Sequence, residues 1–271
     1  MLLQRLITAF FLIFFAGFLA FYEDGFLFPV LILAFHSGIY IEWLSLLNAS
    51  RVQKMSGLIF LIFIFVAVIN VQISQHLLLV LLFVSFFFWL LVSPAVVLDK
   101  YRASKGMGIS VAFIMCLASM IALYYAFVEG LVFLLSILAL VWVIDTGAYF
   151  AGKVFGYRKL FPMVSPNKTW EGVHGALFMY FIYSLFMVKI DGTWQELILY
   201  YFGTWWLIVL SLIIFFVAIL ADLFESKLKR ASGKKDSGSI LPGHGGLFDR
   251  FDATLAVGPL IVFFNIIGPM L

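Results

Sequence analysis

Residues 222–252 concentrate the side chains that could carry out chemistry. This stretch holds 11 of the 31 charged residues and five of the 21 glycines of the chain. Five of the charges are acidic and are interleaved with basic ones, whereas a simple cytoplasmic loop of a membrane protein needs only Lys and Arg. Carboxylates can hold a hard divalent cation, and Lys and Arg can hold phosphates. The mixture predicts phosphoryl or nucleotidyl transfer.

The first part of this stretch predicts a polar stripe. Asp222, Glu225, Ser226 and Lys229 stand at i, i+3, i+4 and i+7, so they would share one face if the preceding apolar run continues as a helix. A row of solvated side chains at the membrane interface is the alternative. Because unpaired charges near a membrane span are costly, we favour a functional stripe.

The end of the stretch places two carboxylates at the start of the last apolar run. Asp249 and Asp252 stand at i and i+3, where they suit the positive end of a helix dipole. They also suit a divalent cation, which takes oxygen ligands. Helix capping alone is the alternative, and it applies more to Asp252 than to Asp249.

Between these acids, glycines surround a histidine in Pro242-Gly-His-Gly-Gly246. Glycine allows the backbone to approach a ligand closely, and exposed amides can hold a phosphate. A lone histidine is more often structural, so both a ligand contact and a structural role stay open for His244.

A second cluster precedes the first. Asp145 follows a long apolar run, where an acid is a functional candidate, although pairing with a lysine at a helix end is the alternative. Ser165 and Pro166 are typical of an N-cap and a first helical residue. They predict Lys168 in a first helical turn, where a bound anion would offset the unfavourable placement of a cation. Simple capping with a surface lysine is the alternative.

The composition decides which kind of fold positions these clusters. Apolar residues make up 65% of the 271 residues, charged residues 11%, and the mean hydropathy is +1.14. These values exclude a soluble domain, a disordered chain and a disulfide-stapled secreted fold. Strands of a β-barrel would alternate apolar and polar residues, whereas these runs are continuously apolar. The single cysteine, Cys116, excludes an intrachain disulfide. We expect an all-α polytopic membrane protein.

Nine apolar runs are long enough, or nearly so, to cross a bilayer. They lie near residues 6–22, 26–48, 57–73, 77–98, 107–127, 130–151, 173–189, 196–221 and 252–271. We divide the chain into N-terminal helices (1–106), middle helices with a loop at 152–172 (107–172), and C-terminal helices with a loop at 222–252 (173–271).

The basic residues predict the orientation of these nine spans. When loops are assigned alternately to the two sides, 16 of the 17 basic residues fall on one side and only Lys189 on the other. The positive-inside rule then places the N-terminus in the cytoplasm and the C-terminus outside. Both long loops are cytoplasmic, so we expect the active site on that face.

Residues 226–252 resemble the signature of the bacterial phosphatidate cytidylyltransferases, also called CDP-diacylglycerol synthases. The 27 residues match the pattern S-x-L-K-R-x4-K-D-x-G-x2-L-P-x-H-G-G-x2-D-R-x-D without a departure. The blocks 145–149 (DTGAY) and 165–172 (SPNKTWEG) also resemble that family and occur in the expected order. The resemblance covers roughly the C-terminal half of the chain, and the preceding spans carry no signature.

The resemblance implies that CTP and phosphatidic acid react to form CDP-diacylglycerol and pyrophosphate. It also implies an enzyme of phospholipid biosynthesis in the bacterial inner membrane that needs Mg²⁺ and acts as a homodimer. K⁺ as a second ion is a family-level alternative that the sequence does not test. We expect CTP, phosphatidic acid and membrane lipids as partners, and no nucleic acid.

Under this hypothesis, the phosphate of the lipid attacks the α-phosphorus of CTP in line. We predict Asp222 and Asp249 as Mg²⁺ ligands, with Asp145 or Asp252 as helpers. We predict Lys168, Lys229 and Arg230 as catalytic cations that bind phosphates. The remaining predicted substrate contacts are Ser165, Asn167, Ser226, Lys235, His244, Gly245, Gly246 and Arg250.

Other functions fit parts of the pattern. A CTP-dependent lipid kinase of the dolichol-kinase type would release CDP instead of pyrophosphate. A transporter of an anionic solute could also carry membrane charges, but here the charges gather at one face and no paired broken helices are evident. The D-G-x2-A-R motif of CDP-alcohol phosphotransferases is absent from the sequence. No argument from the sequence assigns a role to His36 or Glu42.

Overall fold

The structure is a computed structural model that describes residues 27–71, 74–99, 104–240 and 245–270. Within these ranges, seven helices are long and apolar enough to cross a membrane. A single two-stranded sheet accompanies them. The expected all-α polytopic membrane architecture is therefore confirmed. The run predicted at 6–22 lies outside the described residues, so the count of nine and the orientation stay predictions.

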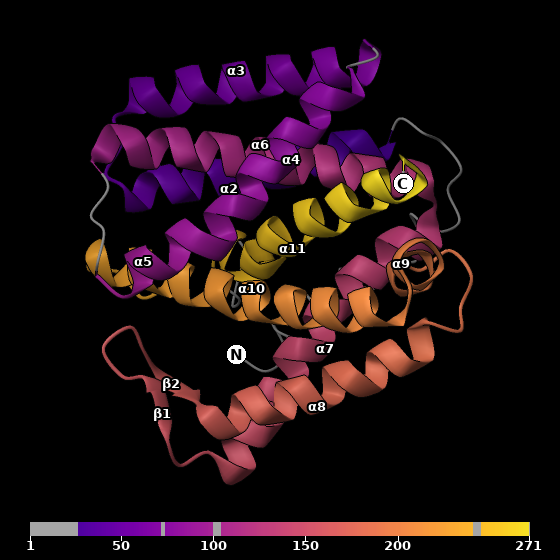
Figure 1. The fold of residues 1–271 in the computed structure, drawn as a ribbon. Coiled ribbons are helices and arrows are strands. Elements are labelled where there is room, and N and C mark those ends of the chain that lie inside the picture. The colour runs from indigo at the N-terminus through magenta and orange to yellow at the C-terminus, as the bar shows by residue number, and fades with distance from the viewer. Residues whose placement is uncertain (1–26, 72–73, 100–103, 241–244, 271) are drawn as a thin grey trace.

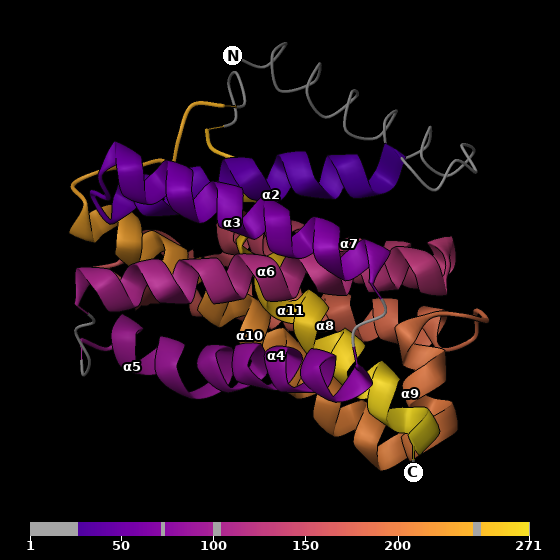
Figure 2. The same cartoon turned by 90° about the horizontal axis from the view of Figure 1, so that it is seen from above.

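The N-terminal half of the described chain forms helices with serine caps. Ser50, Ser74 and Ser104 each accept the backbone N–H three residues further on, which satisfies one free donor of the first turn. α6 lies between α2 and α3 on one side and α4 and α5 on the other (Figure 2). The bounds are α2 Leu27–Leu46, α3 Arg51–Asn70, α4 Gln75–Phe87, the π-helical η1 Phe88–Val92, α5 Ser93–Val97 and α6 Lys105–Glu129.

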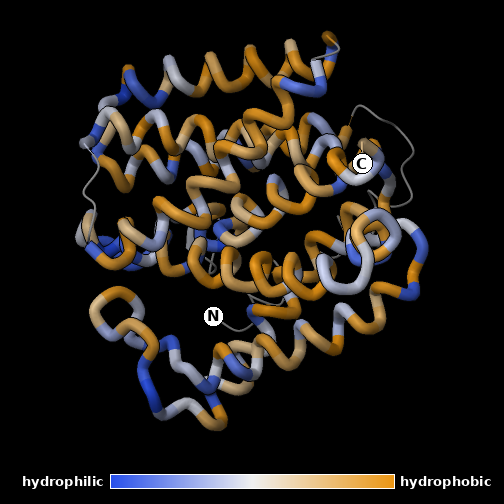
Figure 3. The backbone as a smooth tube through the Cα atoms, viewed as in Figure 1, coloured by the Kyte–Doolittle hydropathy of each residue, from blue (hydrophilic) through white to orange (hydrophobic). Residues whose placement is uncertain are grey.

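The C-terminal half supplies the central helix of the protein. α11 is buried along most of its length and packs against α10, α6 and α4 (Figure 1). Hydrophilic segments gather mainly at helix ends and in the β-hairpin (Figure 3). The bounds are α7 Leu131–Phe155, β1 Lys159–Phe161, β2 Ser165–Thr169, α8 Trp170–Met187, α9 Trp194–Phe202, α10 Thr204–Ala231, α11 Phe248–Ile267 and η2 Gly268–Met270.

The run predicted at 196–221 is two helices, not one. Gly203 has φ +83°, a left-handed conformation that separates α9 from α10. α10 then continues as far as Ala231, so the first ten residues of the predicted loop at 222–252 are helical. The physical reason is that no glycine or proline interrupts this segment before Gly233, which has φ +70°.

The predicted helix start at Ser165–Pro166 is wrong. Residues 165–169 form β2, which pairs antiparallel with β1. A residue before proline avoids the helical region, and the ladder satisfies the backbone of the extended chain. α8 begins later, where Thr169 caps it and its Oγ1 accepts the N–H of Gly172 at 3.2 Å. Lys168 therefore lies in a strand and not in a first helical turn.

The hairpin is tied to the helices at both of its ends. The carboxylate of Glu171, in the first turn of α8, accepts the backbone N–H groups of Tyr157 and Arg158. These hydrogen bonds hold the pKa of Glu171 below its usual range, and the bond from Tyr157 has the largest effect. α7 and α8 also pack closely at Gly147, where no side chain separates them. A Cβ added there would lie only 3.0 Å from the backbone of Ala176. The hairpin thus projects from a rigid helix pair.

Candidate functional site

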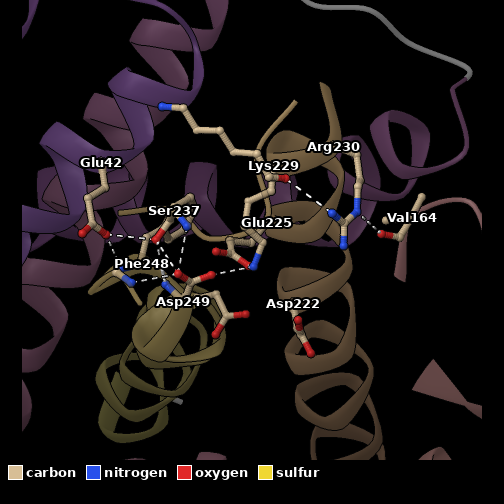
Figure 4. Close-up of polar contacts among 12 residues, drawn as sticks. Glu42, Val164, Asp222, Glu225, Lys229, Arg230, Ser237, Phe248 and Asp249 are labelled. Carbon is tan, nitrogen blue, oxygen red and sulfur yellow. Dashed lines mark hydrogen bonds and ion pairs between the residues drawn. The ribbon is translucent and has the colours of Figure 1, made fainter. Parts of the chain in front are cut away.

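Three carboxylates meet between α10 and α11. Oxygen atoms of Asp222, Glu225 and Asp252 all lie within 4.8 Å of one another. Asp222 and Glu225 are one turn apart on α10, and Figure 4 shows Asp222, Glu225 and Asp249 facing the space between the two helices. The predicted polar stripe on a continuing helix is therefore confirmed. Three oxygen donors at this spacing are the type of ligand that a hard divalent cation takes.

The environment of Glu225 supports a cation at this position. Glu225 is only 1% exposed, and its Oε1 is buried without a hydrogen-bond partner. Burial of a charged oxygen without a partner is costly, and a metal ion is one of the groups that removes the cost. The residues present therefore fit a bound Mg²⁺. The stripe included Glu225, but sequence reasoning did not single it out as a ligand.

Lys229 joins Glu225 to Asp249 across the two helices. Its Nζ lies 2.5 Å from Glu225 Oε2 and 2.6 Å from Asp249 Oδ1. The other oxygen of Asp249 accepts the N–H and the hydroxyl of Ser237 and the N–H of Gly246, each at 2.9 Å. Since protein donors occupy both oxygens of Asp249, direct ligation by Asp249 stays a prediction. Here its carboxylate organises the loop that precedes α11.

Lys168 brings the hairpin to the carboxylates. Its Nζ lies 2.5 Å from Asp222 Oδ2, which links β2 to α10. Asp145 on α7 is exposed but interacts electrostatically with Asp222, Lys168 and Arg250. Four elements that are far apart in the sequence (α7, β2, α10 and α11) therefore converge on this site.

The formal charge of the site is unbalanced. Five carboxylates face three basic groups, which leaves a formal excess of two negative charges in a half-buried region. A divalent cation would neutralise this excess. The acids are Asp145, Asp222, Glu225, Asp249 and Asp252, and the bases are Lys168, Lys229 and Arg250.

Other predicted contacts lie around this centre rather than in it. Arg230 turns toward the hairpin, where its Nε donates to the carbonyl of Val164 at 3.3 Å. Ser226 is buried on α10 beside Glu225. The exposure of the rest varies: Ser165 is half-buried in β2, and Asn167 and Lys235 are exposed. Arg250, one of the three bases of the site itself, is also exposed. Gly245, with φ +85°, and Gly246 lie against Asp249, and His244 lies outside the described residues.

Glu42 of α2 is the residue of this region that sequence reasoning left without a role. It is 4% exposed, its Oε2 accepts the N–H of Phe248 at 2.8 Å, and the same oxygen lies 3.0 Å from the hydroxyl oxygen of Ser237, whose one hydrogen is shared between Glu42 and Asp249. A Cβ at Gly238 or Gly246 would collide with this carboxylate. Glu42 thus satisfies a free donor at the start of α11 and holds the loop beside Asp249 (Figure 4). The available signal was an acid within an apolar run.

Replacement of Glu42 by Ala is expected to lower the free energy of unfolding by about 2–3 kcal/mol, because buried donors lose a charged acceptor. Glu42→Gln keeps one acceptor oxygen and is expected to lose less. Thermal unfolding in detergent measures stability, and hydrogen exchange of residues 232–240 and 245–247 reports whether the contacts around Ser237 and Gly246 open. Glu196→Gln, in α9, is the matched control. Unchanged exchange in the alanine variant would contradict the assigned role.

Comparisons with known proteins show which family the chain resembles. A family model described as the cytidylyltransferase family matches residues 3–267. The phosphatidate cytidylyltransferase of Staphylococcus aureus (strain COL) is 45% identical over 133 residues, which cover 49% of this chain and 48% of that protein. The protein of the same name from Staphylococcus saprophyticus is 43% identical over 140 residues, 51% of each chain. The chain thus spans about half the length of the curated relatives it matches.

Proposed function

Because the chain belongs to the cytidylyltransferase family, we propose that it transfers the cytidylyl group of CTP to phosphatidic acid, with CDP-diacylglycerol and pyrophosphate as products. The observation that carries this proposal is the group formed by the half-exposed Asp222 and the buried Glu225 and Asp252, beside the cations Lys168 and Lys229. Such a site can hold two polyanions together. The names of the relatives support CTP and phosphatidic acid as the substrates.

The lipid phosphate acts as the nucleophile in this reaction. One of its oxygens forms a bond to the α-phosphorus of CTP, while the bond from that phosphorus to the pyrophosphate oxygen breaks. A phosphate monoester is mostly ionised near neutral pH, since its second pKa is about 6, so the reaction needs no dedicated base. The work of the protein is to bring the two phosphates into line and to offset their charge.

Basic side chains at the site would bind these phosphates. Lys168 is well placed, because its strand lies at the edge of the carboxylate group and its side chain is 24% exposed. Its ammonium can turn from Asp222 toward a phosphate. Lys229 is more buried and holds two acids, so we assign it to the organisation of the site. Arg230, Lys235 and Arg250 would contribute to the surrounding positive field.

Asp222, Glu225 and Asp252 would hold Mg²⁺, with Asp145 and Asp249 as further candidates. When bound, the ion would supply charge neutralisation for the phosphoryl oxygens that react. K⁺ as a second ion and a homodimer are further parts of the proposal that rest on the family resemblance. The distribution of basic residues supports insertion in the inner membrane with the site on the cytoplasmic face, where CTP is found.

The direct test uses purified protein in detergent with phosphatidic acid, Mg²⁺ and CTP labelled at the α-phosphate. The expected result is label in the lipid fraction together with an equimolar amount of pyrophosphate. Label released as CDP, with phosphate added to the lipid, would show a lipid kinase instead. No transfer to any lipid acceptor by folded protein would contradict both activities and favour transport of an anionic solute.

A further inference from the structure

A large apolar cavity lies on the side of α10 that faces away from the carboxylates. Its volume is about 1230 Å³, above the range of about 300–1,000 Å³ that is typical of pockets for small ligands. It opens between the last turns of α2 and α10, the segment from α4 to α5, and the first turns of α6. α5 and the end of α10 lie side by side at the left of Figure 1.

Two different faces of α10 separate this cavity from the candidate active site. Phe224, Lys227 and Leu228 line the cavity, whereas Asp222, Glu225 and Lys229 point to the carboxylate group. At about 100° per residue, the centres of these two faces are about 140° apart around the helix. The cavity therefore opens on a different face of α10 from the carboxylate group, none of whose acids lines it, and Arg230 at its rim lies next to the hairpin of the candidate active site.

The helical wall of the cavity is about as long as one membrane leaflet is thick. The wall from Phe87 to Val96 measures about 14 Å at a helical rise of about 1.5 Å per residue. Half of a bilayer hydrocarbon core is about 15 Å thick. The deeper lining consists of aromatic and aliphatic side chains from several helices: Trp43, Leu47, Phe87, Phe88, Leu91 and Val111. These are surfaces against which acyl chains pack.

The rim of the cavity is basic. Lys105, Lys227 and Arg230 line its polar end, and Asp99 is the acidic residue among the lining residues. Lys227 lies 2.5 Å from Asp99, and Lys105 donates to the carbonyl of Asn48. Among the described residues of the rim, three basic side chains and one acidic side chain give a formal charge of +2. Both lysines stand at helix ends, which is where a membrane protein meets the phosphates of lipid headgroups.

We propose that this cavity binds an anionic phosphoglyceride of the surrounding bilayer. Its acyl chains lie against the walls formed by α4, η1 and α6, and its phosphate lies at Lys105 and Lys227. The proposal needs only that the helices span a membrane, so it goes beyond the proposed reaction and does not depend on it. The charges on the two faces of α10 fit this arrangement: Asp222 and Glu225 on one face suit a metal, and Lys227 on the other suits a lipid phosphate.

Photo-crosslinking in nanodiscs tests the proposal. The protein is placed in phosphatidylcholine nanodiscs that contain a trace of phosphatidylglycerol with a diazirine in one acyl chain, without CTP or Mg²⁺. After irradiation, mass spectrometry is expected to locate the crosslinks in peptides that contain residues 87–96 and 107–111. Phosphatidylcholine with the same diazirine chain is expected to label these peptides at least fivefold less.

Three variants distinguish a specific site from general lipid contact. Lys105→Gln and Lys227→Gln are each expected to reduce labelling by phosphatidylglycerol about fivefold, the effect of about one lysine near a phosphate. Lys54→Gln removes a lysine that contacts Ser45 outside the cavity, and it is expected to have no effect. Ala95→Trp fills the cavity and is expected to abolish labelling.

The proposal is overturned if both lipids label equally, or if labelling persists in Ala95→Trp. It is also overturned if Lys105→Gln and Lys227→Gln behave like Lys54→Gln. Monodisperse elution and an unchanged unfolding temperature establish that each variant is folded, and the rim lysines can be exchanged without loss of core packing. Since no turnover is measured, failure here leaves the proposed transferase activity intact, and failure of that activity leaves this test valid.

Discussion

Replacement of Glu225 by Gln is expected to lower Mg²⁺-dependent turnover by about 10²–10³-fold, the typical effect of removing one stabilising group from a preorganised site. Gln has nearly the same shape as Glu but lacks its negative charge. Glu225 is also the member of the carboxylate group with a buried oxygen that has no protein partner. We therefore expect it to act as a ligand through this oxygen, while its other oxygen keeps the ion pair with Lys229.

Two measurements separate this role from a purely structural one. Binding of Mg²⁺ to the purified protein, followed by calorimetry without substrates, is expected to weaken at least tenfold in Glu225→Gln. Glu196→Gln, which changes a carboxylate of α9, is expected to bind the ion normally. Normal Mg²⁺ affinity and normal turnover in Glu225→Gln would remove the group of Asp222, Glu225 and Asp252 from the metal site.

The second large effect is expected for Lys168→Ala. The proposed reaction needs a cation at the edge of the carboxylate group, and Lys168 is brought there by its contact with Asp222. Loss of this ammonium is expected to lower turnover about 10²–10³-fold. Stability is expected to fall by about 1–3 kcal/mol, because the two side chains are 24% and 39% exposed but the Nζ of Lys168 is itself buried, so the pair lies between a surface and a buried ion pair. Steady-state kinetics with CTP and thermal unfolding measure the two effects separately.

Lys159→Ala is the matched control for this experiment. Lys159 lies in β1 of the same hairpin and has the same charge, but it is exposed, whereas Lys168 is paired with Asp222. It is expected to keep at least half of the turnover. An equal loss in both variants would show that general positive charge of the hairpin matters, and an unchanged rate in Lys168→Ala would exclude it from phosphate binding.

Several properties of this protein were predicted by the sequence because they depend on local pattern. Continuous apolar runs leave no fold but membrane helices, and composition alone establishes this. The spacing of Asp222, Glu225 and Lys229 predicted their shared face, because helical periodicity depends only on the order of residues. The signature at 226–252 indicated the family for the same reason, since it is a feature of the linear sequence.

The tertiary structure decided how the elements meet. The pairing of Lys168 with Asp222 depends on a β-hairpin, and the sequence suggested a helix start instead because Ser-Pro fits both. The link from Glu42 to Phe248 joins residues 206 positions apart, and no periodicity reports such a contact. The packing of α10 against α11 places Glu225 next to Asp222 and Asp252. The same packing places Asp249 where protein donors bind its carboxylate. Local pattern determines each element, whereas packing between elements determines which of their side chains share a site.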